Sequence, residues 1–184
     1  MPTINNLNVK GPLNAGVDQL IERWVATDAA TSKTFSNLHG DTDLEYYIRA
    51  RIVNGYNGAI NIQSRLNNDS GNNYGFQNFS GADTATAAAR DTSEAQLYLS
   101  NTSAQNEIMV FEYTINAKSG VVRTIIGTSI DDISTTTVTK AWCFGQVWNN
   151  TADEITSIVF LSNQTNGIGA GSEISLWCRR GVAS

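Results

Sequence analysis

The chain has 184 residues, of which 41% are hydrophobic and 16% are charged, and its formal net charge at pH 7 is −5. This length suffices for one sizeable hydrophobic core, and the composition excludes an intrinsically disordered chain. The 12 Lys and Arg residues are scattered and are outnumbered by 17 acidic residues. Nucleic-acid binding, which requires a basic surface that neutralises phosphates, is therefore not expected.

Fifteen glycines and many Asn, Thr and Ser residues indicate strands and turns rather than long helices. No stretch approaches the roughly 20 consecutive apolar residues of a membrane span. The first residues, Met1 to Asn6, lack the basic and apolar regions of a signal peptide. We therefore expect a protein that is made in the cytoplasm and has no membrane partner.

Residues 1–18 contain both prolines and isolated apolar side chains in a polar background, a pattern that predicts an extended N-terminal arm. A frayed terminus is the alternative, because chain ends are poorly ordered unless something ties them down. An extended arm can bind along a partner through main-chain hydrogen bonds and shallow side-chain pockets. The side chains expected to attach this arm are Ile4, Leu7, Val9 and Leu13.

The following segments alternate apolar and polar residues with a period of two, as half-buried strands do. Residues 20–27 also fit one face of a short helix, but an apparent return at 33–36 favours a strand and its hairpin partner. The clearest strand runs from Asp43 to Val53, and Ala59 to Leu66 repeats its pattern. Further strands are predicted at 95–99, 107–115, 121–127, 136–148, 155–161 and 173–179.

Several of the later strands carry apolar side chains on both faces. A two-layer sandwich has one interior, so the second face needs a cover from the same chain or from another subunit. A closed cyclic assembly would bury such a face, and we expect a homotrimer. The residues expected at its interface are Trp142, Phe144, Trp148, Ile158 and Phe160.

The segment from Asn67 to Gly75 is the densest cluster of turn-forming residues. Asn and Asp tolerate a left-handed backbone and bond to their own main chain, and Gly71 permits positive φ. Their oxygen atoms would also suit calcium or a sugar, but one Asp in nine residues is few for calcium. We expect a hydrogen-bonded turn from which Tyr74 returns to the sandwich, with ion or sugar binding as the alternative.

Two acidic pairs, Asp131-Asp132 and Asp153-Glu154, lie at predicted strand ends, where the carboxylates of a glycosidase could sit. Neither pair has neighbours that would separate its two pKa values, so solvated turn charges are expected. A single His and two distant Cys residues offer no nucleophilic dyad and no set of zinc ligands. The sequence thus predicts no catalytic residue, no metal site and no cofactor.

Cys143 and Cys178 each follow a Trp inside an apolar run, which predicts small buried thiols. A disulfide between them is the alternative, although a cytoplasmic protein argues against it. The glycine-rich stretch from Gly167 to Gly171 leads into a strand pattern, whereas phosphate-binding loops open a helix. These glycines are expected to let the chain cross between sheets before the closing strand.

Three segments stand out together: Asp-Leu-Glu-Tyr-Tyr-Ile at 43–48, Asn-Asp-Ser-Gly-Asn-Asn-Tyr at 68–74, and the pair formed by 155–158 and 169–177. In this order they resemble the jelly-roll module of tailed-bacteriophage virion proteins. The resemblance covers roughly residues 20 to 180 and extends to capsid decoration proteins, head fibres and tail appendages. The closing residues Trp177-Cys178-Arg179-Arg180 depart from the Leu-Tyr-Gly-like end of that family.

We therefore expect an all-β fold, in which one antiparallel β-sandwich of jelly-roll type spans residues 19–184 behind a short arm of residues 1–18. The resemblance implies a non-enzymatic capsid decoration (cement) protein that binds the major capsid protein on the virion surface as a trimer. The small share of chain left for attachment favours this role over a tail fibre, which needs a longer shaft.

The alternative function is a tail-associated receptor-binding module that recognises host surface glycans through exposed aromatic rings. A glycan-degrading enzyme is a third class, and the lack of a convincing acid pair disfavours it. The rings expected to contact a glycan are Tyr47, Tyr56, Tyr74 and Trp177.

Overall fold

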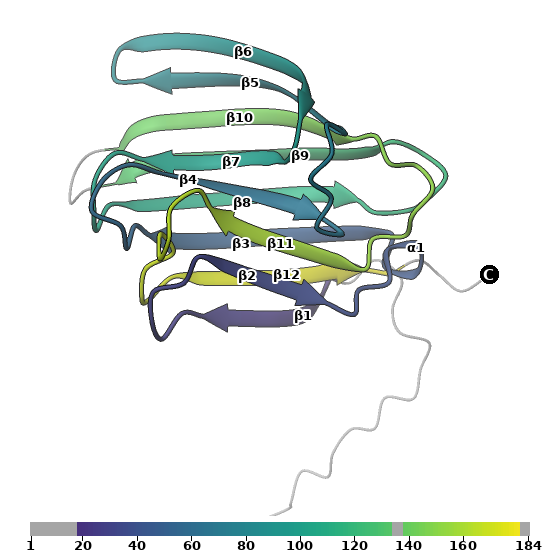
Figure 1. The fold of residues 1–184 in the computed structure, drawn as a ribbon. Coiled ribbons are helices and arrows are strands. Elements are labelled where there is room, and N and C mark those ends of the chain that lie inside the picture. The colour runs from purple at the N-terminus through teal and green to yellow at the C-terminus, as the bar shows by residue number, and fades with distance from the viewer. Residues whose placement is uncertain (1–17, 134–137, 181–184) are drawn as a thin grey trace, which may run out of the picture.

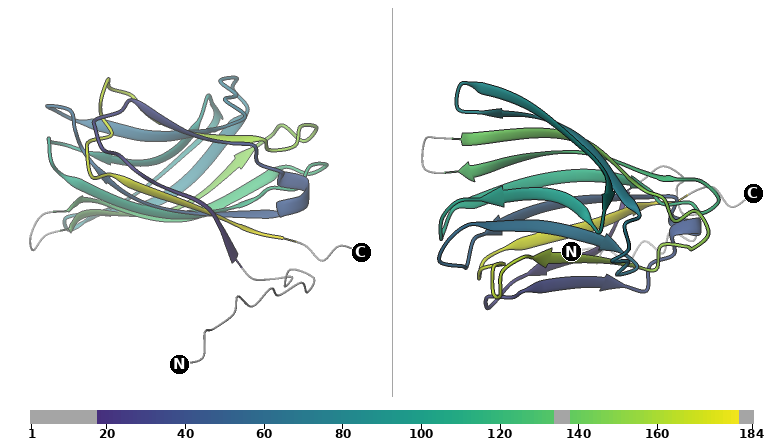
Figure 2. Two further views of the ribbon diagram at one scale, coloured as in Figure 1. Left: turned by 90° about the horizontal axis from the view of Figure 1, so that it is seen from below. Right: turned by 45° about the horizontal axis from the view of Figure 1, so that its top comes forward.

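The fold is an antiparallel β-sandwich of jelly-roll type, as the sequence predicts (Figures 1 and 2). The computed structural model describes residues 18–133 and 138–180. The arm residues Ile4, Leu7, Val9 and Leu13 lie outside the described residues. Among the residues that are described, no helix is long and apolar enough to cross a membrane.

Two sheets face each other across one hydrophobic core. In spatial order, the eight-stranded sheet consists of β1 (Asp18–Val25), β12 (Glu173–Arg179), β3 (Glu45–Val53), β8 (Ile108–Asn116), β9 (Arg123–Ile133), β10 (Val138–Trp148), β5 (Tyr74–Ala82) and β6 (Ala85–Glu94). The four-stranded sheet consists of β2 (Ser32–Ser36), β11 (Ser157–Ser162), β4 (Ile60–Leu66) and β7 (Leu97–Thr102). One short helix, α1 (Gly40–Asp43), joins β2 to β3.

The predicted hairpin between residues 20–27 and 33–36 is wrong, although both segments are strands. β1 pairs with β12 in the larger sheet, and β2 pairs with β11 in the smaller one. The residues between them bond to the β11–β12 connection instead of forming a tight turn: the Ala26 and Ala30 N–H groups each donate to a carbonyl, of Ser172 and Ile168 respectively, at 2.8 Å. Two crossovers between the sheets therefore run side by side, and the prediction that the Gly167–Gly171 stretch changes sheets is confirmed.

The hairpin of β5 and β6 has no counterpart among the predicted strands. It forms the edge of the larger sheet opposite β1 (Figure 1). Nine of the ten β6 residues are exposed, so no buried face imposes an apolar alternation on the sequence of this strand. The periodicity that reveals β3 and β4 is consequently missing from β6.

The proposed oligomer interface is wrong, because four of its five residues belong to the core. Trp148, Ile158 and Phe160 are fully buried and Phe144 is 6% exposed. The Phe160 ring, on the smaller sheet, stacks on Phe111 of the larger sheet with centroids 6.2 Å apart. Trp142 is partly buried on the same inward face. The faces of β10 were thus assigned in reverse: the inward face holds the large aromatic rings, and smaller residues lie outside.

Cys178 is buried, as predicted, but Cys143 is exposed. The alternation along β10 turns Phe144 inward and therefore turns Cys143 away from the core. Both cysteines are free thiols.

Candidate functional site

The outer face of the eight-stranded sheet, which points away from the smaller sheet, carries the most varied chemistry of the fold. Along β3 the inward residues are buried, whereas Tyr47, Arg49 and Arg51 point outward. The register brings Tyr47 opposite Trp177 of β12, and Arg49 opposite Glu112 of β8. Alternation on three neighbouring strands thus collects aromatic, cationic and anionic groups on one surface.

Tyr47 and Trp177 form an aromatic pair on this face. Their ring centroids are 5.4 Å apart with an interplanar angle of 40°, and both side chains are partly exposed. The Tyr47 hydroxyl donates a hydrogen bond to Glu112 Oε2 at 2.7 Å. Burial raises the pKa of Tyr47, and the Glu112 carboxylate raises it further, so the hydroxyl remains a donor. The hydrogen bond fixes the orientation of the Tyr47 ring against Trp177.

Charged pairs border the aromatic rings on both sides. Arg23 binds Glu173 in a bidentate ion pair, with both N–O distances at 2.7 Å. The Arg23 hydrogen bond lowers the pKa of Glu173, which stays ionised. At the other end, Arg179 contacts Asp18 at 3.1 Å and Glu45 at 2.8 Å.

Two hollows lie on this face over β1, β12, β3 and β8, and together we call them the outer-face groove. Its main hollow has a volume of about 470 Å³ and is lined by Arg23, Arg49, Arg51, Glu173, Ser175 and Trp177, among others. A second, smaller hollow of about 220 Å³ is lined by Asp18, Glu45, Tyr47, Thr114 and Arg179. The floor is a paired sheet, which holds the side chains in fixed relative positions.

The structure brings together two of the four aromatic residues predicted to contact a glycan. Tyr47 and Trp177 line the outer-face groove, whereas Tyr56 is exposed on the connection from β3 to β4. The prediction for Tyr74 is wrong, because this side chain is 1% exposed and its ring stacks on Trp148. The Leu66 N–H donates to the Tyr74 hydroxyl at 3.0 Å. The ring and the hydroxyl of Tyr74 are therefore both buried and cannot contact a glycan.

The charged residues of the groove were not singled out from the sequence. Arg49 and Arg51 do appear there as the polar side of the clearest strand, and that alternation is the signal that could have identified them. Arg23, Glu112 and Glu173 come from other strands. Only the strand order of the sheet shows that they meet, and the sequence pattern does not contain that order.

The Asn67–Gly75 segment is the hydrogen-bonded turn that the sequence predicts, and Tyr74 begins β5. Asp69 Oδ1 accepts the Gly71 N–H at 2.8 Å, and Oδ2 accepts from Trp148 Nε1 at 2.7 Å and Asn73 Nδ2 at 2.9 Å. Burial raises the pKa of Asp69, but these three donors outweigh it and hold the pKa below its usual value. The carboxylate is thus already satisfied by the protein. Within the described residues no cluster of His, Cys, Asp and Glu suits a metal ion.

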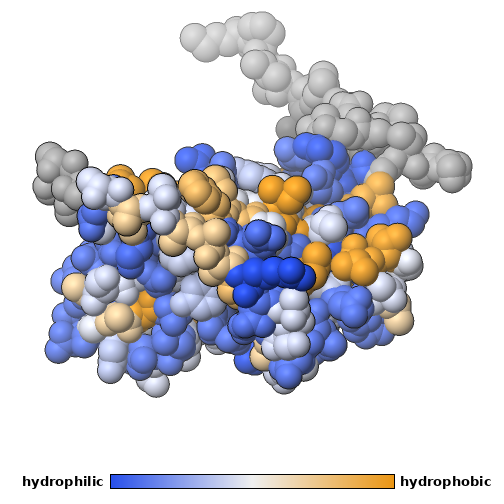
Figure 3. All heavy atoms as spheres, turned by 90° about the horizontal axis from the view of Figure 1, so that it is seen from above, coloured by the Kyte–Doolittle hydropathy of each residue, from blue (hydrophilic) through white to orange (hydrophobic). Residues whose placement is uncertain are grey.

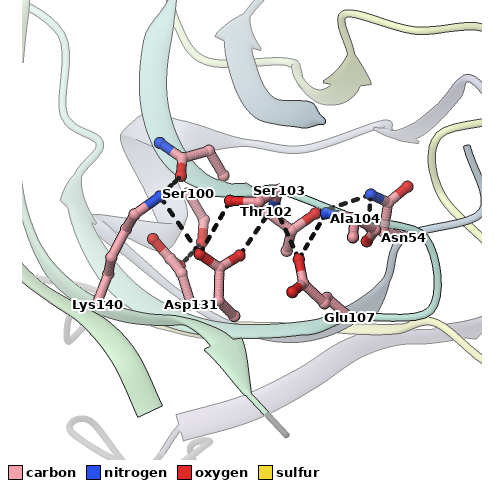
Figure 4. A network of polar contacts seen from close by, with 10 residues as sticks. Asn54, Ser100, Thr102, Ser103, Ala104, Glu107, Asp131 and Lys140 are labelled. Carbon is pink, nitrogen blue, oxygen red and sulfur yellow. Dashed lines mark hydrogen bonds and ion pairs between the residues drawn. The ribbon is translucent and has the colours of Figure 1, made fainter. Parts of the chain in front are cut away.

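The Asp131-Asp132 pair is not a set of solvated turn charges, contrary to the prediction. Asp131 is fully buried and Asp132 is 7% exposed. Ser100 of β7 donates to Asp131, and the Ser103 N–H donates to Asp132 at 3.0 Å. Lys140 lies 3.4 Å from Asp132. Figure 4 shows the polar network that contains Asp131, Ser100, Ser103 and Lys140. The two carboxylates therefore tie the end of β9 to the smaller sheet, and they do not face a common open site.

No protein-family model matches this sequence, and no curated protein matches it. The chain is similar to the galectin LEC-6 of Caenorhabditis elegans, with 11% identity over 85% of this chain and 94% of that chain and a TM-score of 0.34. It is also similar to the PL-14 alginate lyase of Aplysia kurodai, with 9% identity over 85% of this chain and 80% of that chain and a TM-score of 0.35. A bifunctional GH43-CE protein of Bacteroides eggerthii matches with 9% identity over 72% of this chain and 17% of that chain, at a TM-score of 0.32. At these TM-scores the similarities carry no argument about function.

Proposed function

We propose that the protein is a non-enzymatic, virion-associated receptor-binding module that recognises host surface glycans through the outer-face groove. The observation that carries this proposal is the Tyr47–Trp177 pair, which lines the outer-face groove together with Arg and Glu side chains.

The chemistry of the groove suits a sugar ring. The apolar face of a saccharide packs on aromatic rings, and its hydroxyl groups bind to planar side chains such as Arg and Glu. Arg49 and Glu112 lie in register beside the aromatic pair, one as a donor and the other as an acceptor. An open groove on a sheet gives modest affinity at one site, so such a module relies on several copies bound at once.

The proposal is tested with Trp177→Ala on an array of bacterial surface glycans. We expect this variant to bind its best glycan at least about tenfold more weakly than the wild type, because the stacking surface is lost. Trp177→Tyr keeps a ring and should retain part of the affinity. Tyr56→Ala removes an exposed ring outside the groove and should bind as the wild type does.

Two outcomes of this experiment would overturn the proposal. One is wild-type binding by a Trp177→Ala protein whose circular dichroism and melting temperature show an intact fold. The other is the absence of binding by the wild type to every saccharide on the array.

Capsid decoration is the second candidate, and one observation favours it. The half of the outer face over β9, β10 and β5 exposes large apolar side chains: Ile126 is 72% exposed and Phe79, which pairs with Cys143 in the register, is 56% exposed. Figure 3 looks onto the edge formed by β5 and β6, and it shows hydrophobic residues gathered along its upper side. Exposed apolar surface of this kind marks contacts between proteins more often than contacts with sugars.

Sedimentation with expanded phage heads tests this candidate. If the major capsid protein covers the apolar half, Ile126→Asp should abolish co-sedimentation while Trp177→Ala has no effect. The glycan-binding proposal predicts a different result. Neither variant changes the amount of protein that sediments with heads, and only Trp177→Ala reduces binding to host cells.

A further inference from the structure

We infer that the outer-face groove selects anionic saccharides, whose carboxylate or sulfate groups are held by Arg49 and Arg51. This inference rests on the proposed glycan-binding function and specifies the class of glycan.

The first step is the placement of the two guanidinium groups. Arg49 and Arg51 are two residues apart on β3, so they leave the same face of the sheet about 7 Å from each other. Both side chains are exposed, and both line the main hollow together with Trp177. A saccharide stacked on Trp177 would therefore lie within reach of two cationic forks.

The second step is that these two guanidinium groups are unoccupied in the part of the chain that the structure describes. Neither Arg49 nor Arg51 forms an ion pair there, and the one hydrogen bond that either side chain donates is a long contact of 3.4 Å from Arg51 to the Gly171 carbonyl. Other arginines already have partners within the protein. Arg123 is buried and donates hydrogen bonds to backbone carbonyls, and Arg180 forms an ion pair with Asp43 at 3.0 Å.

The third step concerns the carboxylates that face the pair. Glu173 is bound in bidentate fashion by Arg23, and Glu112 accepts the Tyr47 hydroxyl. Glu112 is the cross-strand neighbour of Arg49, but the two are not within ion-pair distance. Arg23 and Glu173 neutralise each other, so the main hollow keeps the guanidinium groups of Arg49 and Arg51, with the Glu112 carboxylate beside Arg49, in a chain whose net charge is −5.

The fourth step is the match between donor and ligand. A guanidinium group presents parallel N–H donors that bind a carboxylate or a sulfate at two points, and it remains charged at every physiological pH. A neutral sugar can also accept hydrogen bonds from these donors, but it carries no charge and gains no ion-pair energy from either cation. The geometry therefore favours an acidic sugar over its neutral counterpart.

Titration calorimetry with three probes tests the inference: trigalacturonate, galactotriose and a sulfated galactotriose. We expect the wild type to bind at least one acidic probe about tenfold or more tightly than galactotriose, and to lose this preference as salt is added. The better of the two acidic probes identifies carboxylate or sulfate as the group recognised. The double variant Arg49→Gln/Arg51→Gln should bind all three probes equally.

Two controls separate charge from fold. Arg90→Gln removes an exposed arginine of β6, outside the groove, and should leave all three affinities unchanged. Arg49→Lys/Arg51→Lys keeps both charges but loses the planar forks, and should retain only part of the preference.

The outcomes also separate this inference from the function on which it rests. Wild-type binding to galactotriose that equals or exceeds binding to both acidic probes overturns the inference and leaves the glycan-binding function intact. The inference is likewise overturned if the Arg→Gln pair keeps the acidic preference, or if none of the three probes binds while the glycan array gives Trp177-dependent binding. Failure of the array itself overturns the function.

Discussion

Asp131 is the residue whose environment departs most from what its sequence position suggests. Burial raises its pKa to about 6 from an ordinary 3.8, and the adjacent Asp132 carboxylate adds to this rise. Between about pH 3.8 and pH 6, Asp131 therefore holds a proton in the folded state that it has released in the unfolded state. The contribution of Asp131 to the free energy of unfolding is fully present below about pH 3.8 and is lost as the pH rises through about 6.

We expect Asp131→Asn to stabilise the protein above pH 7, because the buried group no longer ionises. The upper limit of the gain is about 3 kcal/mol, from a pKa difference of roughly two units at 1.36 kcal/mol each. Near pH 4 the two proteins should have similar free energies of unfolding, since Asp131 is then protonated. Urea titrations at the two pH values measure the difference, and an equal effect at both would contradict the assigned pKa.

Gly127 lies at a point of β9 where the core leaves no room for a side chain. An added Cβ would lie 2.5 Å from the Glu112 carbonyl oxygen and 2.6 Å from the Phe144 ring. Gly127→Ala should therefore lower the free energy of unfolding by about 1–3 kcal/mol. Gly145→Ala on the outer face, where nothing lies within 4 Å, is the matched control and should have little effect. Equal stability of the two variants by thermal melting would show that the core adapts to the extra methyl group.

Single side chains were predictable from the sequence where one strand decides their position, and unpredictable where a second strand does. The alternation along β3 places Tyr46 inside and Arg49 outside without further information. The burial of Asp131 depends on Ser100, 31 residues away on the other sheet. A residue next to a predicted turn gives no sign of such a contact.

Among whole elements, β6 is the strand that the fold protects least. It is an edge strand with both faces exposed, and residues 85–89 contain no charge and no proline to block further pairing. Ala88→Lys should therefore change the melting temperature little, whereas Ala50→Lys on the inward face of β3, at 3% exposure, should prevent folding. A large loss of stability in Ala88→Lys would mean that β6 is covered in solution.

The elements that the sequence predicted well are those with one buried face, and the errors concern pairing rather than the existence of strands. β3, β4, β8 and β12 lie within two residues of their predicted ranges, because each alternates against the core. β1 and β2 were also found, but a sequence cannot show that the residues between them bond to the β11–β12 connection. The outer-face groove spans four strands. The sequence could therefore identify some of its residues, but not which strands bring them together.

For the whole molecule, the strand order determines the chemistry of the two thiols. Cys143 on β10 and Cys178 on β12 are separated by β9, β8 and β3. Four inter-strand spacings of about 4.8 Å place them roughly 19 Å apart, whereas a disulfide requires Cα atoms within about 7 Å. The two side chains also point to opposite faces of the sheet, one exposed and one buried. No disulfide can form within one folded chain.

We therefore expect one thiol to react with a colorimetric disulfide reagent in the native protein and two in guanidinium chloride. Burial raises the pKa of Cys178, which reduces its reactivity further, so the native signal belongs to Cys143. Cys143→Ser should abolish that signal and leave the denatured count at one. The melting temperature should be the same with and without dithiothreitol, because no cross-link contributes to stability. A fall of several degrees on reduction would require a disulfide, and hence a strand order different from the one described.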